Sequence, residues 1–290
     1  MPDVIERLKS DVLIGPGPEC LRSQYDQLND SGGEWITGHP QAYQDVVRAQ
    51  FEIGCDFFEV GLGGHAGIEL GKLGKEDKTP NIVRRVLELT REVIPSGCYL
   101  VGHMLRPTNV QPPFGEATPA EVYDSYQRQA VLADEGGVDL IRMVFDSIEQ
   151  MELGIQAIGT ISQLPIAASF SLSPTPKGFR TWTGLDFRVG VKKLDELGVE
   201  IVGNSCGVIG YREVTTVLEE MKAVSNMYLW PRPNAGTPEL VGGKTVYSGT
   251  PEQYAQEALK WVEAGARLIS GCCGTTPEHT AKLVAAVRHA

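Results

Sequence analysis

The stretch "TPEQYAQEALKWVEAGARLISGCCGTTPEHTAKLVAAVRHA", residues 250–290, predicts two amphipathic helices separated by one short strand. Each helical segment opens with Thr-Pro, which suits a helix amino terminus because threonine caps the backbone and proline fits the first turn. The glycine at 265 is a typical helix stop, and an apolar run at 266–272 follows it directly. The stretch therefore indicates a helix–strand–helix unit of an α/β protein.

The same alternation recurs along the whole chain. Apolar, often β-branched runs predict strands at 12–15, 56–61, 98–104, 138–145, 165–172, 199–205, 227–233 and 266–272. Amphipathic segments predict helices at 39–54, 79–94, 118–137, 146–159, 185–198, 211–224, 250–265 and 276–290. This pattern favours an α/β fold of the (β/α)₈ TIM-barrel type, with a doubly wound open sheet as the alternative. The barrel is preferred because no glycine-rich dinucleotide motif follows the first strand, and we expect residues 1–290 to form one domain.

Composition narrows the class of protein. The 290 residues are 42% hydrophobic and 22% charged, which is ordinary for a globular protein with a full core. A net charge of −11 argues against nucleic acid or an anionic membrane as a partner. The amino terminus lacks a signal-peptide pattern, no apolar run approaches a membrane span, and six irregularly spaced cysteines do not suggest a disulfide framework. We therefore expect a cytoplasmic enzyme, with homo-oligomer formation left open.

Three cysteines lie at the carboxyl ends of predicted strands: Cys206 after the sixth, and Cys272 and Cys273 after the eighth. In a (β/α)₈ barrel these ends form the active-site face, so we expect the three thiols to converge. Three thiolates suit Zn²⁺, bound about 2.3 Å from each sulfur with a fourth position open. Such a site favours alkyl transfer onto a substrate thiol, because a bound thiolate stays nucleophilic at neutral pH. A redox pair and chance proximity remain alternatives at this point.

The carboxyl-terminal motifs resemble those of a known family. "PNAGTPELVGGKTVY" (233–247) followed by "GARLISGCCGTTPEH" (265–279) is similar to the homocysteine S-methyltransferase family, the zinc-dependent module of cobalamin-dependent methionine synthase and betaine–homocysteine methyltransferase. The family's Gly-Gly-Cys-Cys-Gly-Thr motif matches Ser270–Thr275, and its Gly-x-Asn-Cys motif matches Gly203–Cys206. The resemblance implies a (β/α)₈ barrel, zinc on the three cysteines and a thiol as methyl acceptor.

Two departures concern the substrate. Family members hold the homocysteine ammonium with an aspartate after the first strand and a glutamate after the fourth. Here Ile14 stands at the first position, the fourth strand lacks the Glu-Thr pair, and Arg142 lies nearby. An ammonium group left unpaired in a closed site is costly, whereas arginine favours a carboxylate or sulfonate. One hypothesis is therefore a changed, non-amino-acid substrate; the other is homocysteine held differently, for instance through Glu59.

Candidate substrate-binding residues are glycines and polar side chains near predicted strand ends, namely Gly15, Gly17, Glu59, His103, Arg142, Ser205 and Asn234. Glu59 is expected either to contact substrate or to form an ion pair with Arg142 inside the barrel. His103 is a candidate proton shuttle or extra metal ligand, with a hydrogen-bonded structural role as the alternative. The family implies that Asn234 orients a substrate loop, and Ser205 stands where its zinc motif carries asparagine.

Other aromatic and sulfur-containing residues are weaker candidates. Trp182 and Trp230 would hold a cationic methyl donor by cation–π attraction, with core packing as the alternative. His65 lies in a glycine-rich loop without phosphate-binding spacing. His279 and His289 are interpreted as surface or capping residues. The remaining cysteines, at 20, 55 and 98, are expected to be small core residues.

These observations predict a zinc-dependent S-methyltransferase acting on homocysteine or a related thiol. The sequence leaves the donor open between a methylated corrinoid, a sulfonium and a betaine. The chain has no cobalamin-binding Asp-x-His-x-x-Gly motif, so we expect a corrinoid donor to be carried by a separate protein. Two rivals are a zinc hydrolase, which normally uses His and carboxylate ligands, and a non-catalytic zinc or thiol sensor.

Overall fold

The computed structural model describes residues 3–21, 32–63, 79–105 and 118–289 of the chain. Within these residues, parallel strands follow the predicted positions closely: β1 Leu13–Ile14, β2 Phe57–Gly61, β3 Tyr99–His103, β4 Leu140–Phe145, β5 Ile166–Thr175, β7 Ile201–Gly207, β8 Tyr228–Arg232 and β11 Leu268–Ile269.

The strands close into a barrel. The order β2-β3-β4-β5-β7-β8 forms one continuous parallel sheet, and β1 pairs with β11. A parallel bridge between Leu229 and Ala266 joins β8 to β11. On the other side, the Asp56 amide donates to the Ile14 carbonyl at 2.7 Å and joins β1 to the start of β2. The (β/α)₈ barrel prediction is therefore confirmed, and the open sheet is excluded because the first and last strands meet.

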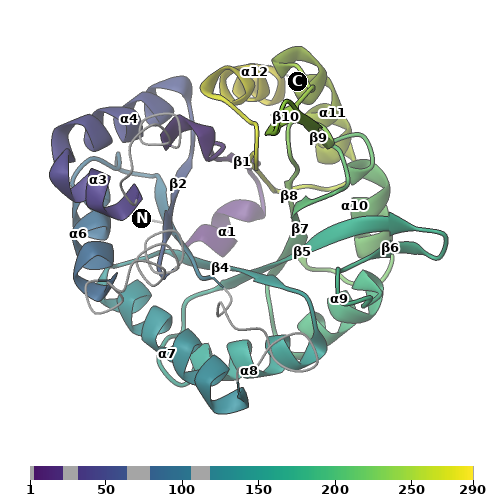
Figure 1. Cartoon of the computed structure of the whole chain (residues 1–290), viewed down its shortest axis with the longest axis horizontal. Coiled ribbons are helices and arrows are strands. Elements are labelled where there is room, and N and C mark those ends of the chain that lie inside the picture. Colours follow the sequence, from purple (N-terminus) through teal and green to yellow (C-terminus); the bar gives the residue numbers. More distant parts are fainter. Residues whose placement is uncertain (1–2, 22–31, 64–78, 106–117, 290) are drawn as a thin grey trace.

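Helices surround the ring of strands (Figure 1). Their bounds are α4 Pro40–Ile53, α6 Thr79–Arg91, α7 Pro119–Glu135, α8 Ile148–Gly159, α9 Phe187–Glu196, α10 Val214–Lys222, α11 Pro251–Glu263 and α12 Pro277–Arg288. Thr118, Thr250 and Thr276 form capping boxes, as the Thr-Pro pairs predicted. Gly54 and Gly265, both at φ 106°, end the helices before β2 and β11.

Two apolar layers follow from the alternation of side chains along each strand. Outward residues such as Phe58, Ile141 and Phe170 pack against the helices in one cluster. Inward residues such as Phe57, Leu140 and Trp230 fill the lower barrel in a second cluster, which α1 Val4–Leu8 completes. Helix α1, which was not predicted, lies at the centre of the ring in Figure 1 and covers the amino-terminal end of the barrel with Val4 and Leu8.

Further elements follow β1, β5 and β8 in the chain. Helix α3 Gly32–Gly38 packs beside α6, and β5 extends beyond its predicted end to pair with β6 Gly178–Arg180 in a hairpin. A second hairpin, β9 Pro238–Val241 with β10 Lys244–Tyr247, follows β8. Neither hairpin was predicted from the sequence.

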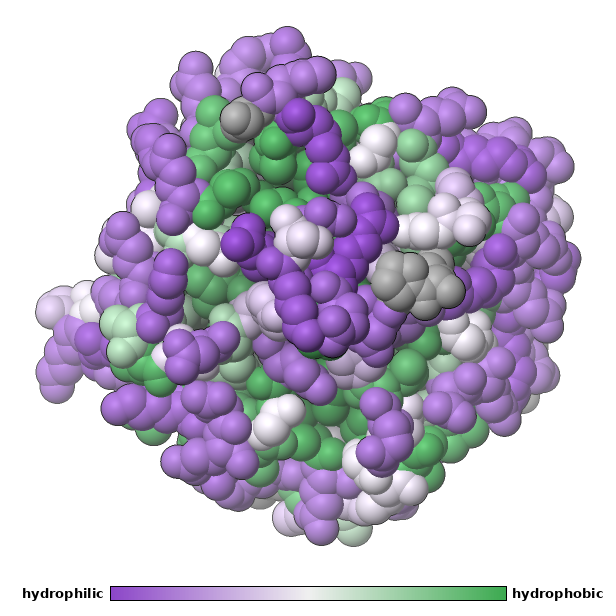
Figure 2. Space-filling model, turned by 180° about the vertical axis from the view of Figure 1, so that it is seen from behind, coloured by the Kyte–Doolittle hydropathy of each residue, from purple (hydrophilic) through white to green (hydrophobic). Residues whose placement is uncertain are grey.

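The face of the molecule opposite to the view of Figure 1 is mostly polar. Seen from behind in Figure 2, hydrophilic side chains prevail on this face and apolar ones show mainly between them. Among the described residues, no helix combines the length and apolar character that crossing a membrane requires.

Candidate functional site

Three thiols meet at the carboxyl ends of β7 and β11. Cys206 and Cys272 are paired as a disulfide, and Sγ of Cys273 lies 3.8 Å from Cys206 and 4.0 Å from Cys272. Three sulfurs bound tetrahedrally to one zinc ion at about 2.3 Å would lie about 3.8 Å apart. The donor set and the two separations from Cys273 fit a metal ion held by three thiolates, which requires that the Cys206–Cys272 pair be reduced.

The backbone of β7 turns sharply at its end to present the first thiol. Among the described non-glycine residues, Cys206 alone has a positive φ, at 58°, and Gly207 follows at 83°. The pairing register between β5 and β7 shifts at the same place. A non-glycine residue in this left-handed region is strained, and such strain is concentrated at functional sites. The turn directs Cys206 toward the thiols of the final strand instead of continuing the alternation of β7.

The loop after β8 ties the two cysteine segments together. The Asn234 amide Nδ2 donates to the Gly207 carbonyl at 3.0 Å. The Ala235 amide donates to the Cys273 carbonyl at 3.0 Å, and the Cys272 amide donates to the Pro233 carbonyl at 2.9 Å. Asn234 is 2% exposed and does not line the adjoining cavity. Its contacts therefore hold this loop against the cysteine segments.

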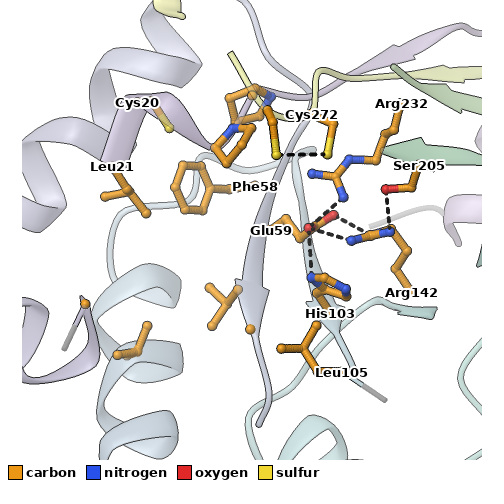
Figure 3. A pocket seen from close by; sticks show the side chains of 18 of the residues that line it. Cys20, Leu21, Phe58, Glu59, His103, Leu105, Arg142, Ser205, Arg232 and Cys272 are labelled. Atoms are coloured by element: carbon orange, nitrogen blue, oxygen red, sulfur yellow. Dashed lines mark hydrogen bonds and ion pairs between the residues drawn. The ribbon is translucent and has the colours of Figure 1, made fainter. Parts of the chain in front are cut away.

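A cluster of four charged or titratable side chains lies below the thiols (Figure 3). Arg142 donates to Glu59 from Nε at 2.9 Å and from Nη2 at 3.3 Å. Arg232 Nη1 lies 3.1 Å from Glu59 Oε1, and His103 Nδ1 lies 3.4 Å from the same oxygen. Arg142 also reaches the Ser205 hydroxyl at 3.4 Å. The predicted Glu59–Arg142 ion pair is thus present, with a second arginine added.

Charge and burial together set the protonation of this cluster. Burial raises the pKa of Glu59, but Arg142 foremost, then Arg232 and His103, lower it to about 2. Burial and then Arg232 lower the pKa of Arg142 to about 10, although Glu59 opposes the shift. At neutral pH Glu59 and Arg142 are therefore both charged.

One cavity of about 370 Å³ adjoins both the thiols and the charged cluster. Glu59, His103, Arg142, Ser205 and Arg232 line its polar side, together with the three cysteines. The other side is apolar and extends over β2 toward α3 and α6; its members include Leu21, Ile36, Phe58, Val83 and Val86. Figure 3 shows Leu21 and Phe58 set apart from the charged cluster. The cavity is the default binding site because polar groups converge in an otherwise apolar hollow.

The two predicted glycines allow close packing. A Cβ at Gly15 would lie 2.1 Å from the Phe57 ring, and one at Gly17 would lie 1.9 Å from the Thr275 hydroxyl. Gly17 lines the cavity, whereas Gly15 does not. His103 lies with Glu59 and is not part of the thiol group, which among the described residues contains three cysteines only.

The other candidates lie away from the cavity or outside the described residues. Trp230 is buried, packs edge-to-face on Phe57 with ring centroids 5.2 Å apart and donates to Ser270, so the core-packing interpretation holds. Trp182 is 46% exposed and is not a lining residue. His279 caps α12 and is buried, His289 is exposed, and His65 lies outside the described residues.

Cys20 lines the cavity but behaves as a core residue. It is 6% exposed, and burial raises the pKa of its thiol to about 12, so it is protonated at neutral pH. Burial also raises the pKa of Cys55 and Cys98. None of these thiols belongs to the three-cysteine group of the described chain.

The sequence analysis missed Arg232. A signal was present, because Arg232 lies two residues after the inward-facing Trp230 and therefore faces the barrel interior. Only the closed ring of strands shows that it reaches Glu59, 173 positions earlier in the chain, at 3.1 Å.

Comparisons with known proteins agree with this arrangement. The family model described as homocysteine S-methyltransferase matches residues 18–287. Methionine synthases of Mycobacterium leprae and Mycobacterium tuberculosis are each 24% identical over 307 residues, covering 98% of this chain and 25% of the relative. The chain therefore spans about a quarter of the length of these curated relatives.

A solved structure shares the fold. The metallated form of the homocysteine methyltransferase MmuM from Escherichia coli superimposes with a TM-score of 0.74 at 19% identity over 96% of each chain. The family model covers nearly the whole chain. In this chain the paired-cysteine motif follows the last barrel strand, β11. This protein therefore belongs to the homocysteine S-methyltransferase family.

Proposed function

We propose that this chain is a single-domain, zinc-dependent S-methyltransferase in which Cys206, Cys272 and Cys273 hold the metal. The observation that carries the proposal is the convergence of three thiols, all within 4.8 Å of one another, at the edge of a cavity. Bound zinc supplies Lewis acidity that lowers the pKa of a substrate thiol at its open position.

The chain's own residues orient that thiol and exclude water from its surroundings. The loop at 233–235 holds the cysteine segments in place, and the apolar side of the cavity excludes water from the reacting sulfur. The thiol proton leaves to solvent, and the sulfur lone pair then forms the new bond to the methyl carbon. The bond from that carbon to the donor breaks, and the donor departs with the electron pair.

The donor and acceptor are proposed by chemical class. The acceptor is homocysteine or another small thiol. The donor is a sulfonium, a betaine or a methylated corrinoid. Residues 1–290 contain no cobalamin-binding Asp-x-His-x-x-Gly motif, so a corrinoid donor would be bound outside these residues.

The test combines metal content with methyl transfer under reducing conditions. Wild-type protein should contain one zinc ion per chain and methylate a thiol in a mass-spectrometric assay that pairs several thiols with each donor class. Cys273→Ala should lose zinc and at least 100-fold in transfer rate, whereas Cys98→Ser, a half-buried thiol outside the cavity, should retain both. Full transfer activity in a zinc-free Cys273→Ala protein would sink the proposal.

Zinc retention without methylation of any thiol by any donor would instead favour a non-catalytic sensor. Transfer is therefore measured alongside binding, so that the enzyme and sensor interpretations give different results.

A further inference from the structure

The polar side of the cavity carries an excess of positive charge. Of its described lining residues, Glu59 is the carboxylate, whereas Arg142 and Arg232 are both guanidinium groups. The two arginines are 1% and 6% exposed. Positive charges removed from water to this extent require compensation, and one carboxylate balances only one of them.

Both oxygens of Glu59 already have partners. Its Oε2 accepts from Arg142 at 2.9 Å, while Oε1 lies 3.3 Å from Arg142, 3.1 Å from Arg232 and 3.4 Å from His103. Three groups therefore crowd Oε1, and the charge of the carboxylate is already shared between two guanidinium groups. Glu59 is therefore poorly placed to bind the ammonium group of an amino-acid substrate.

The arginines, by contrast, retain unused donors. A guanidinium carries five N–H groups. Arg142 uses Nε and Nη2 on Glu59 and Nη1 on Ser205, whereas Arg232 uses Nη1 on Glu59 and Nε on the Gly271 carbonyl at 3.2 Å. Because Gly271 precedes Cys272 directly, Arg232 is anchored beside the thiol group.

We propose that Arg142 and Arg232 form a binding subsite for an anionic group, so that the thiol substrate of this site is an acid carrying a carboxylate or sulfonate. Arginine suits this role because its planar fork matches the two oxygens of such an anion. The inference rests on the proposed function, because the three cysteines would bind the thiol end of the same substrate through zinc.

Calorimetric titrations with small probes test the charge preference. The probes are 3-mercaptopropionate, 2-mercaptoethanol, cysteamine and homocysteine, each added to zinc-loaded protein. We expect 3-mercaptopropionate to bind at least ten-fold more tightly than the neutral and cationic thiols. Arg232→Met should lower the affinity for 3-mercaptopropionate at least ten-fold and leave that for 2-mercaptoethanol unchanged. The matched control is Arg48→Met, which removes an exposed arginine of α4 paired with Asp45.

Glu59→Gln is expected to increase an affinity, and a misfolded protein would not show such a gain. Removing the competing carboxylate should strengthen 3-mercaptopropionate binding several-fold, because both guanidinium groups then face the ligand. Loss of cysteamine binding in this variant, with no gain for the acid, would show that Glu59 clamps an ammonium and would overturn the inference. An equal loss for both neutral and acidic thiols in Arg232→Met would also overturn it, since the arginines would then balance the zinc–thiolate charge alone.

Metal-free, reduced protein separates this inference from the proposed function. Preference for 3-mercaptopropionate over cysteamine should persist there, at weaker affinity, and should be lost in Arg232→Met. If zinc binding or methyl transfer fails while this preference remains, only the proposed function is wrong. If transfer succeeds but the acid shows no preference in either form, only the anion subsite is wrong.

Discussion

Glu59 shows how one inward-facing residue acquires its properties from neighbours on other strands. It lies on β2, while Arg142, His103 and Arg232 come from β4, β3 and β8. Alternation along each strand brings all four into the same level of the barrel. An isolated carboxylate in this interior would be protonated; the two guanidinium groups keep it charged.

Acid unfolding should reveal the Glu59 pKa. The folded value, about 2, lies below the ordinary 4.5, so the charged carboxylate stabilises the fold above about pH 4.5 and this contribution is lost as the pH falls toward 2. Wild-type protein should therefore exceed Glu59→Gln in free energy of unfolding at pH 7, and the difference should shrink between pH 5 and 2. Urea titrations across this range measure it. A difference that stays constant would contradict the assigned charge state.

An exposed glutamate provides the comparison. Glu6 on α1 forms an ion pair with Lys9, and both side chains are more than half exposed. Glu6→Gln should change the free energy of unfolding by less than about 1 kcal/mol at any pH.

Strand β7 combines packing and function over seven residues, Ile201–Gly207. At Gly203 the backbone of β8 passes so closely that a Cβ would lie 1.8 Å from the Trp230 carbonyl oxygen. Three residues later the chain turns through Cys206 in a left-handed conformation. The glycine of the motif therefore sets the approach of two strands, and the cysteine at its end depends on that approach.

Gly203→Ala should disturb both properties of β7. Because the Cβ would meet backbone and not a flexible side chain, we expect a loss of about 2–3 kcal/mol in the free energy of unfolding and a lower zinc content. Gly159→Ala is the matched control, since nothing lies within 4 Å of the added Cβ at the end of α8. Chemical unfolding with metal analysis measures both effects. Equal stability and zinc content in the two variants would show that the strands adjust.

At the scale of the whole molecule, the two ends of the described chain meet at one buried carboxylate. Asp56 precedes β2 and accepts from the Ile14 amide at 2.8 Å, from Arg7 after the start of α1 at 3.2 Å, and from Arg288 at the end of α12. These contacts lie where β1 joins β2, which is the point at which the barrel closes. Closure therefore depends on residues more than 230 positions apart in the chain.

Replacing this carboxylate should weaken the whole barrel. Asp56→Ala leaves the Ile14 amide without its side-chain acceptor and removes one acceptor each from Arg7 and Arg288, so we expect a loss of about 2–4 kcal/mol in the free energy of unfolding. Asp11→Ala removes a partner of Arg7 that is 45% exposed and should leave the free energy of unfolding nearly unchanged, because exposed ion pairs contribute little. Differential scanning calorimetry compares the two variants. A similar small change in both would mean that Asp56 does not secure the seam.

The sequence by itself determined the strands and helices of the barrel and the grouping of the three cysteines. Thr-Pro pairs marked the starts of α7, α11 and α12, because capping and proline geometry act locally. Glycines marked helix ends for the same reason. The three thiols were also predictable, because each follows a strand and the strand ends of a barrel share one face.

Only the tertiary structure decided the charge of the site and the closure of the ring. The grouping of Glu59, Arg142 and Arg232 depends on the stagger of strands around the barrel, which no local pattern specifies. Helix α1 likewise covers the amino-terminal end of the barrel only because the closed strands bring Leu13 and Trp230 together there, where Val4 and Leu8 pack with them. Residues distant in the chain become neighbours through packing, and their charges then set the electrostatic character of the cavity.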